Sequence, residues 1–154
     1  MKEARFNIID AIAILGIAGL IAVGAWFFTN LDTGENVTVY FTVEIRERED
    51  GFADLIEVGD EIRDAVRNYF LGHVHNVEVR PTEIITFDQD NQAFIYSRIP
   101  ERYDVWLTVR GVGTETASAI ATHGQEVRVG QEVFLRGRGY AGLGFIVNLR
   151  TEAN

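Results

Sequence analysis

The chain begins with a long apolar run and then changes to an alternation of apolar and polar positions. From residue 11 to residue 28 no side chain is polar, and two isoleucines ahead of Asp10 lengthen the run. A helix rises ~1.5 Å per residue, so a run of this length covers roughly the ~30 Å hydrocarbon thickness of a bilayer. A helix of a soluble core would show a polar stripe, and this run shows none. The pattern predicts a transmembrane helix over residues 8–28.

The ends of the run predict its orientation. Lys2 and Arg5 precede it, whereas acidic residues follow it. The positive-inside rule then places the N-terminus in the cytoplasm, and Trp26, Phe27 and Phe28 in an aromatic belt at the far headgroups. We therefore predict an uncleaved signal anchor in the inner (cytoplasmic) membrane, single-pass, with an extracytoplasmic C-terminal domain. A cleaved signal peptide is the alternative.

Small residues and one acid give this helix candidate contacts. Ala11, Ala18, Ala22 and Ala25 fall on one helical face, which allows close helix–helix contact. Small residues are common in membrane helices, so the face can also be without a specific partner. Asp10 lies in the first turn, where the helix dipole favours an anion. A buried ion pair with a partner is the alternative for this acid.

After residue 36 the period of the pattern becomes two, which is typical of strands. Residues 37–45 and 103–109 alternate, and β-branched and aromatic residues dominate both stretches. Further strands are predicted at 70–79, 83–87, 92–97, 116–121, 126–136 and 143–150, with a hairpin loop at 88–91. The expected organisation is a cytoplasmic tail (1–7), the transmembrane helix (8–28), a linker (29–36) and an extracytoplasmic β domain (37–154).

An internal echo refines the fold of the β domain. Residues 56–62 and 71–77 are answered by residues 127–133 and 143–149, with glycines at matching positions. The pattern suits a pseudo-duplicated unit of strand, glycine turn and strand. The fold class is therefore mainly β: an N-terminal transmembrane helix followed by a small β-barrel or β-sandwich with a pseudo-repeat. Residues 60–71 read as either a short helix or a strand and turn, and the repeat favours the second.

Composition excludes several kinds of chemistry. The net charge of −9 argues against a nucleic-acid partner, which is bound by neutralising phosphates. The chain has no cysteine, which removes disulfides, thiolate metal sites and thiol catalysis. The only serines, Ser97 and Ser118, lack the context of a nucleophile elbow. We expect no enzyme activity.

Three motifs resemble ligand sites without their full requirements. His73 and His75 share a strand face and could hold a metal with His123 or a carboxylate such as Glu78, but we favour two exposed polar residues on the solvent face. The GxGxxG string that starts at Gly137 precedes a strand instead of a helix. Residues 88–91 imitate the opening of a calcium loop that lacks its glycine and its last glutamate. We expect no metal and no cofactor.

Several segments resemble known bacterial proteins. Residues 7–10, 58–62, 102–105 and 113–116 resemble the domain-of-unknown-function 4330 family of bacterial single-pass membrane proteins. The resemblance covers nearly the whole chain and implies a short cytoplasmic tail, an anchor and an extracytoplasmic β domain, with no established activity. A fainter likeness, at 58–62 and 72–74, is to the mammalian-cell-entry type of lipid-transport domain.

The expected function is non-enzymatic. The leading hypothesis is a membrane-anchored accessory, assembly or scaffold subunit, which contacts membrane lipid and either a membrane-protein partner or its own copies. One alternative is a lipid-handling or hydrophobe-handling oligomer of the cell envelope, with residues 68–71 as its apolar loop. The other is a pilin-like filament subunit processed before Phe6.

Overall fold

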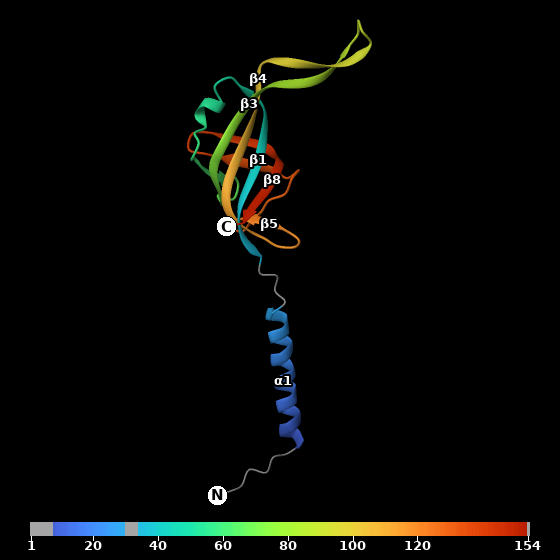
Figure 1. Cartoon of the computed structure of the whole chain (residues 1–154), viewed down its shortest axis with the longest axis vertical. Coiled ribbons are helices and arrows are strands. Elements are labelled where there is room, and N and C mark those ends of the chain that lie inside the picture. Colours follow the sequence, from blue (N-terminus) through green and yellow to red (C-terminus); the bar gives the residue numbers. More distant parts are fainter. Residues whose placement is uncertain (1–7, 30–33, 154) are drawn as a thin grey trace. The chain divides into compact units, whose positions relative to one another are not determined.

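The computed structural model describes residues 8–29 and 34–153 (Figure 1). The chain divides into two compact units, with the boundary after Thr33. The first unit contains one helix, α1 (Ile8–Thr29), and the second is built mainly of strands. The prediction of a mainly β chain is confirmed.

Helix α1 corrects the predicted membrane topology. Among the described residues, no helix has both the length and the apolar character that crossing a membrane requires. This finding contradicts the predicted transmembrane helix at 8–28, the signal anchor and the single-pass inner-membrane location with an extracytoplasmic domain. None of them is carried further.

The structure describes some of the residues that the sequence analysis assigned to this helix and its ends, and not others. Ala11, Ala18, Ala22 and Ala25 all lie on α1, and their use as a contact face stays a prediction. Trp26 is 68% exposed. The side chains of Asp10, Phe27 and Phe28 lie outside the described residues, as do Lys2, Arg5 and Phe6.

The second unit contains eight strands and one short 3-10 helix. They are β1 (Glu35–Glu49), η1 (Ala53–Leu55), β2 (Glu61–Asp64), β3 (Phe70–Asp88), β4 (Ala93–Glu115), β5 (Ile120–Thr122), β6 (Gln125–Glu126), β7 (Glu132–Arg136) and β8 (Ala141–Ala153). Every pairing between them is antiparallel. The strands follow the order β1-β8-β7-β2-β3-β4, and β4 pairs again with β1. Six strands therefore form a closed sheet, and β5 and β6 extend from β4.

The core fills the inside of this closed sheet. On β1, Val39, Phe41, Val43 and Ile45 are at most 1% exposed. On β4, the alternate positions 105, 107 and 109 are equally buried. The two strands lie side by side, with Phe41 opposite the buried position 109. The alternation in the sequence predicted both buried faces correctly.

The predicted pseudo-repeat is present as matched hydrogen bonds. In the first copy the N–H of Gly59 donates to the carbonyl of Val74 (2.8 Å), and the N–H of Val74 donates back to the residue after the glycine (2.9 Å). In the second copy Gly130 and Ile146 make the same two bonds, of 2.7 and 2.9 Å. Both glycines have a left-handed backbone, with φ of +97° and +88°, which glycine adopts without steric cost. Each copy therefore turns at its glycine and places a strand of the closed sheet.

Residues 60–71 form a strand and a turn, as the repeat favoured. β2 ends at Asp64, whose Oδ1 accepts hydrogen bonds from the N–H groups of Val66 (2.9 Å) and Arg67 (2.6 Å). Asn68 then adopts a left-handed backbone, with φ of +61°, and β3 begins at Phe70. A carboxylate that accepts hydrogen bonds from two backbone N–H groups stabilises a tight turn. This turn forms in place of the short helix that the composition of residues 60–71 would allow.

The structure revises several strand boundaries. The strands predicted at 70–79 and 83–87 belong to the single strand β3, and those at 92–97 and 103–109 belong to β4. Only the end of the predicted strand at 116–121 is extended, and the glycine turn at 130 interrupts the one predicted at 126–136. The hairpin loop between β3 and β4 is confirmed.

Tyr140 links the end of the glycine-rich turn to the first repeat. Its hydroxyl donates to Asp60 Oδ2 (3.1 Å), and the residue is 8% exposed. Burial, together with this hydrogen bond and the charge of Asp60, raises the pKa of the Tyr140 phenol above its usual value. The folded state therefore holds the phenolic proton to a higher pH than the unfolded state does.

This difference predicts a loss of stability at alkaline pH. Between the ordinary tyrosine pKa of ~10 and the raised folded value, the free energy of unfolding should fall by up to ~1.4 kcal/mol per pH unit. Tyr140→Phe should remove this slope and cost about 1–2 kcal/mol at pH 7 through the lost hydrogen bond. Urea denaturation between pH 8 and 11 measures both, with the exposed Tyr96→Phe as control. An unchanged alkaline slope in Tyr140→Phe would contradict the assignment.

Candidate functional site

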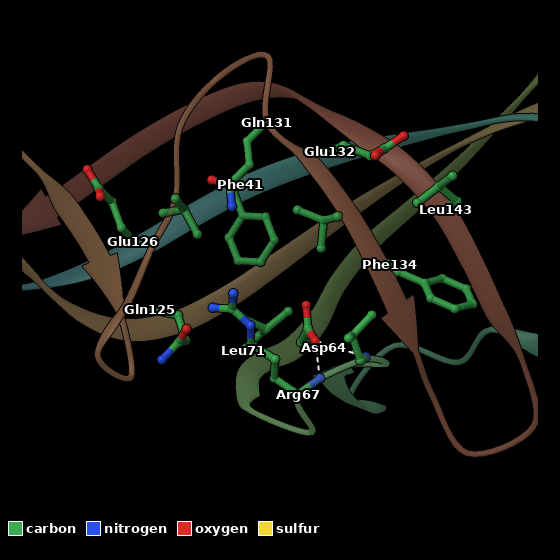
Figure 2. A pocket seen from close by; sticks show the side chains of 13 residues that line it. Phe41, Asp64, Arg67, Leu71, Gln125, Glu126, Gln131, Glu132, Phe134 and Leu143 are labelled. Atoms are coloured by element: carbon green, nitrogen blue, oxygen red, sulfur yellow. Dashed lines mark hydrogen bonds between the residues drawn. The ribbon is translucent and has the colours of Figure 1, made fainter.

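One pocket of the β domain lies over Phe41, between the turn at 64–67 and the segment 125–134 (Figure 2). We call it the Phe41 pocket, and its volume is about 440 Å³. Its floor is apolar, because Phe41, Leu71, Val127 and Val133 are all at most 7% exposed. This volume falls within the usual range of small-molecule sites, about 300–1,000 Å³.

The rim of the Phe41 pocket is polar and mixed in charge. Figure 2 shows the side chain of Arg67 reaching from its turn toward Phe41. Asp64, Glu126 and Glu132 also line the pocket. The arrangement can hold a small apolar group, but three carboxylates against one guanidinium disfavour an anionic head group.

A second pocket contains all three histidines of the chain. We call it the histidine pocket and define it by Phe70, His73, His75, Arg110 and His123. Its volume is also about 440 Å³. The ring of Phe70 contacts His73 (5.2 Å between centroids) and His123 (4.5 Å), so a phenyl ring packs against both imidazoles.

The structure does not gather these histidines as ligands. Among the described residues, no group of three histidine or acidic side chains could hold a metal ion. The predicted pair His73 and His75 shares a pocket with His123, whereas the other suggested ligand, Glu78, forms an ion pair with Arg80 (2.9 Å). The arrangement is a set of separate donors around a cavity.

The remaining motifs have structural roles. The GxGxxG string leads into strand β8, as the sequence analysis expected. Asp88 accepts hydrogen bonds from the side chain of Asn91 (2.7 Å) and from the N–H groups of Asp90 and Asn91. The Asn91 side chain, followed by these backbone donors, lowers the pKa of Asp88. Ser97 shares a hydrogen bond with Thr86 (2.7 Å).

A two-stranded arm is the feature that the sequence analysis missed. Residues 83–88 of β3 pair with residues 93–98 of β4, and within the described ranges no other strand pairs with either segment. Figure 1 shows this ribbon extending beyond the closed sheet. We call residues 83–98 the arm.

The base of the arm is held to the closed sheet. Thr82 is only 3% exposed, and its hydroxyl donates to Asp104 Oδ1 (2.7 Å). The same oxygen accepts the N–H of Glu47 (2.9 Å), which lies at an irregularity in β1. These bonds join three strands, so the arm leaves the sheet from a fixed point.

One face of the arm is apolar and aromatic. Cross-strand pairs put Ile85 beside Tyr96 and Phe87 beside Phe94 on this face. The two phenyl rings pack edge to face, 5.3 Å apart. Phe94 is 75% exposed and Tyr96 76%. The signal for this face was available, because apolar residues occupy successive positions at 84 and 85 and at 94–96, where a strand with one solvated face would alternate.

The predicted apolar loop at 68–71 divides between the two pockets. Phe70 lines the histidine pocket, and Leu71 lines the Phe41 pocket. Tyr69 is 43% exposed. The loop is therefore a wall between two cavities of the domain.

Comparison with known proteins identifies the family. No curated protein matches the chain, and no solved structure matches it. The model of one family, DUF4330, described as a domain of unknown function, matches residues 4–150. This match covers nearly the whole chain, including both copies of the pseudo-repeat, and the protein belongs to the DUF4330 family.

Proposed function

We propose that this protein is a non-enzymatic assembly subunit that associates with a second copy of itself through the aromatic face of the arm. The observation that carries the proposal is the exposure of three aromatic side chains on one face of a projecting ribbon. Phe87, Phe94 and Tyr96 are 53, 75 and 76% exposed. An isolated two-stranded ribbon is marginally stable in water, so an arm with this composition gains stability when its face is covered.

The area of the face suits a two-fold pairing. Fully burying an aromatic side chain removes about 150–250 Å² from water. The three side chains are between half and three quarters exposed, so covering their exposed parts would remove about 300–500 Å² per copy. Two copies then bury about 600–1,000 Å² through aromatic side chains alone. With Ile85 and the backbone of both ribbons, the contact approaches the ~1,200 Å² of the smallest specific interfaces.

Charge favours an antiparallel arrangement of the two arms. The tip carries Asp88 and Asp90, whereas Arg98 lies near the base, is 71% exposed and forms an ion pair with Glu83 of the same arm (3.1 Å). When two arms pair face to face in opposite directions, the two acidic tips lie at opposite ends of the contact, whereas parallel arms would bring the like charges together. Such a contact is isologous, because each copy offers the same surface, and it closes at a dimer.

Two alternatives are less well supported. The apolar floor of the Phe41 pocket favours the lipid-handling hypothesis, but the three rim carboxylates oppose an anionic lipid. No observation on residues 8–29 or 34–153 favours the pilin-like hypothesis.

The absence of native cysteine makes a direct test possible. Tyr96→Cys in the full chain should form a disulfide-linked dimer under mild oxidation, because antiparallel pairing brings the middle of each arm close to its counterpart. Val129→Cys is the matched control, since Val129 is 60% exposed and lies outside the arm. Non-reducing electrophoresis measures the dimer fraction, and we expect at least a tenfold difference between the variants.

A second variant separates the arm from any other contact. Phe94→Ser in the Tyr96→Cys background removes a large part of the aromatic face and should reduce the dimer fraction at least fivefold. Equal cross-linking of Tyr96→Cys and Val129→Cys would mean that association is non-specific, and it would overturn the proposal. So would a strictly monomeric chain at ~100 μM, a concentration at which weak specific dimers form.

A further inference from the structure

The histidine pocket has an unusual charge for this chain. The protein carries 23 acidic and 14 basic residues. Among the residues that line this pocket, however, none is acidic, and four are arginine or histidine. A cavity with cationic side chains and no carboxylate favours an anionic ligand.

Arg110 is the permanent charge in the pocket. Its side chain is exposed on β4, and within the described ranges no carboxylate lies at ion-pair distance from it. Its guanidinium lies 6.0 Å from the ring of Tyr40, which orients it without neutralising it. An arginine without a protein carboxylate has all its donors available for an oxyanion.

The three histidines line the same pocket as this guanidinium, and they come from β3 and from the turn between β5 and β6. His73 lies directly opposite Arg110 on the neighbouring strand. The ring of His75 packs on Tyr40, 5.1 Å between centroids. His123 comes from the turn between β5 and β6, with a left-handed backbone of φ +47°. A non-glycine residue in that conformation is uncommon and is held there by its surroundings.

Charged groups on the neighbouring strands pair with one another and do not neutralise the cations of the pocket. On β2, Glu61 lies opposite His73, but it forms an ion pair with Arg63, also on β2. On β8, Arg150 lies over the far side of Tyr40 (4.4 Å) and is 3.4 Å from Glu152.

The loop before β2 carries two further acids, Glu57 and Asp60, and neither of them lines the pocket. Asp60 accepts the hydroxyl of Tyr140 (3.1 Å) and the N–H of Glu57 (3.2 Å). Its carboxylate is therefore occupied by these bonds. The uncompensated cation at the cavity is Arg110.

We propose that the histidine pocket binds the phosphate group of a small organic phosphate, with Arg110 as the constant anchor and the histidines as donors that strengthen it in acid. The volume of about 440 Å³ leaves room for an organic part beyond the phosphate. Phe70 and Val112, which is 59% exposed, supply an apolar wall for that part. The site is separate from the arm, so the inference does not depend on self-association.

Histidine gives the site a dependence on pH. It is the side chain whose charge changes between about pH 5 and pH 8, and it becomes a cation with two donors as pH falls. Anion affinity should therefore rise as pH falls through this range. Sulfate is the suitable probe for this effect, because it keeps its two negative charges, whereas a phosphate monoester takes up a proton at about pH 6.

The test is a titration of the full chain with inorganic sulfate at pH 5.5 and at pH 8.0. Calorimetry measures the Kd, and the imidazole proton signals in NMR report which histidines respond. We expect the Kd for sulfate to be at least tenfold lower at pH 5.5, with the largest NMR shifts at His73 and His123. Phenyl phosphate should bind at least threefold more tightly than methyl phosphate at pH 5.5, because the two monoesters differ mainly in the phenyl ring.

Variants distinguish the roles. Arg110→Gln should weaken sulfate binding at least tenfold at both pH values, whereas His123→Gln should reduce the ratio between them. Arg138→Gln, an exposed arginine outside the pocket, is the control, and circular dichroism checks that each variant folds. Binding that is unchanged in Arg110→Gln, a Kd independent of pH, or no sulfate binding at pH 5.5 would each overturn the proposal.

Discussion

Gly72→Ala is expected to lower the free energy of unfolding by about 2–6 kcal/mol, the largest effect of any single methyl group that we consider. A Cβ at this position would lie 2.3 Å from the carbonyl oxygen of Arg110, which belongs to the backbone of the paired strand. Overpacking costs about 1–3 kcal/mol, and the backbone φ of +145°, which L side chains rarely adopt, adds about 1–3 kcal/mol. A domain of ordinary stability, ~5–15 kcal/mol, loses much of its reserve.

The pseudo-repeat supplies a second member of this series. Gly144 corresponds to Gly72, and its Cβ would lie 2.4 Å from the carbonyl oxygen of Glu44. Its backbone does not have a left-handed φ. Gly144→Ala should therefore show the overpacking cost alone, about 1–3 kcal/mol, and be milder than Gly72→Ala.

Urea denaturation of the full chain, followed by circular dichroism, measures both effects. Gly139→Ala is the control, because a Cβ there meets nothing within 4 Å and its φ is not left-handed, so its effect should stay within about 0.5 kcal/mol. If Gly72→Ala were as stable as the control, the close approach of β3 and β4 in the closed sheet would be wrong.

The parts of the fold that were predicted correctly are those that a local pattern determines. The alternation at 37–45 and at 103–109 specifies which side chains are buried, since successive residues of a strand face opposite sides. The glycines at 59 and 130 mark turns, because both need a left-handed backbone. These features required no knowledge of distant partners.

The arm was missed because its projection from the sheet depends on tertiary structure and not on the local sequence pattern. Period-two alternation looks alike in a strand inside a closed sheet and in a free ribbon. What separates them is whether a third strand pairs alongside, and for residues 83–98 none does within the described part of the chain. The aromatic residues Phe87, Phe94 and Tyr96 were assigned to strands correctly. The successive apolar positions at 84–85 and 94–96 indicate apolar side chains on both faces, but they do not show whether another strand covers either face.

The histidine pocket was predicted in part. That His73 and His75 share a strand face follows from their spacing, and His123 was named as a possible third member. The chemistry was not foreseen, since the role of Arg110 depends on the register of β3 against β4, which places it opposite His73. The prediction of a transmembrane helix rested on an apolar run alone, and among the described residues no helix has the length and the apolar character that crossing a membrane requires.

Phe41→Ala is the second prediction with a large effect. Phe41 is 1% exposed, packs in the core and forms the floor of the Phe41 pocket. Removing a buried phenyl ring costs its transfer free energy and leaves a cavity, so the free energy of unfolding should fall by about 3–5 kcal/mol. Chemical denaturation with circular dichroism checks this value.

Phe94→Ala is the matched control, since it deletes the same ring where the side chain is 75% exposed. Its stability, measured on the dilute chain so that self-association through the arm does not contribute, should change by less than about 1 kcal/mol. The contrast tests the register of β1 directly, because a shift of one residue would turn Phe41 outward and bring its polar neighbours into the core. Equal losses in the two variants would contradict the inward position of Phe41. A large loss in Phe41→Ala alone would establish that the core lies on this face of β1 and that the Phe41 pocket opens above it.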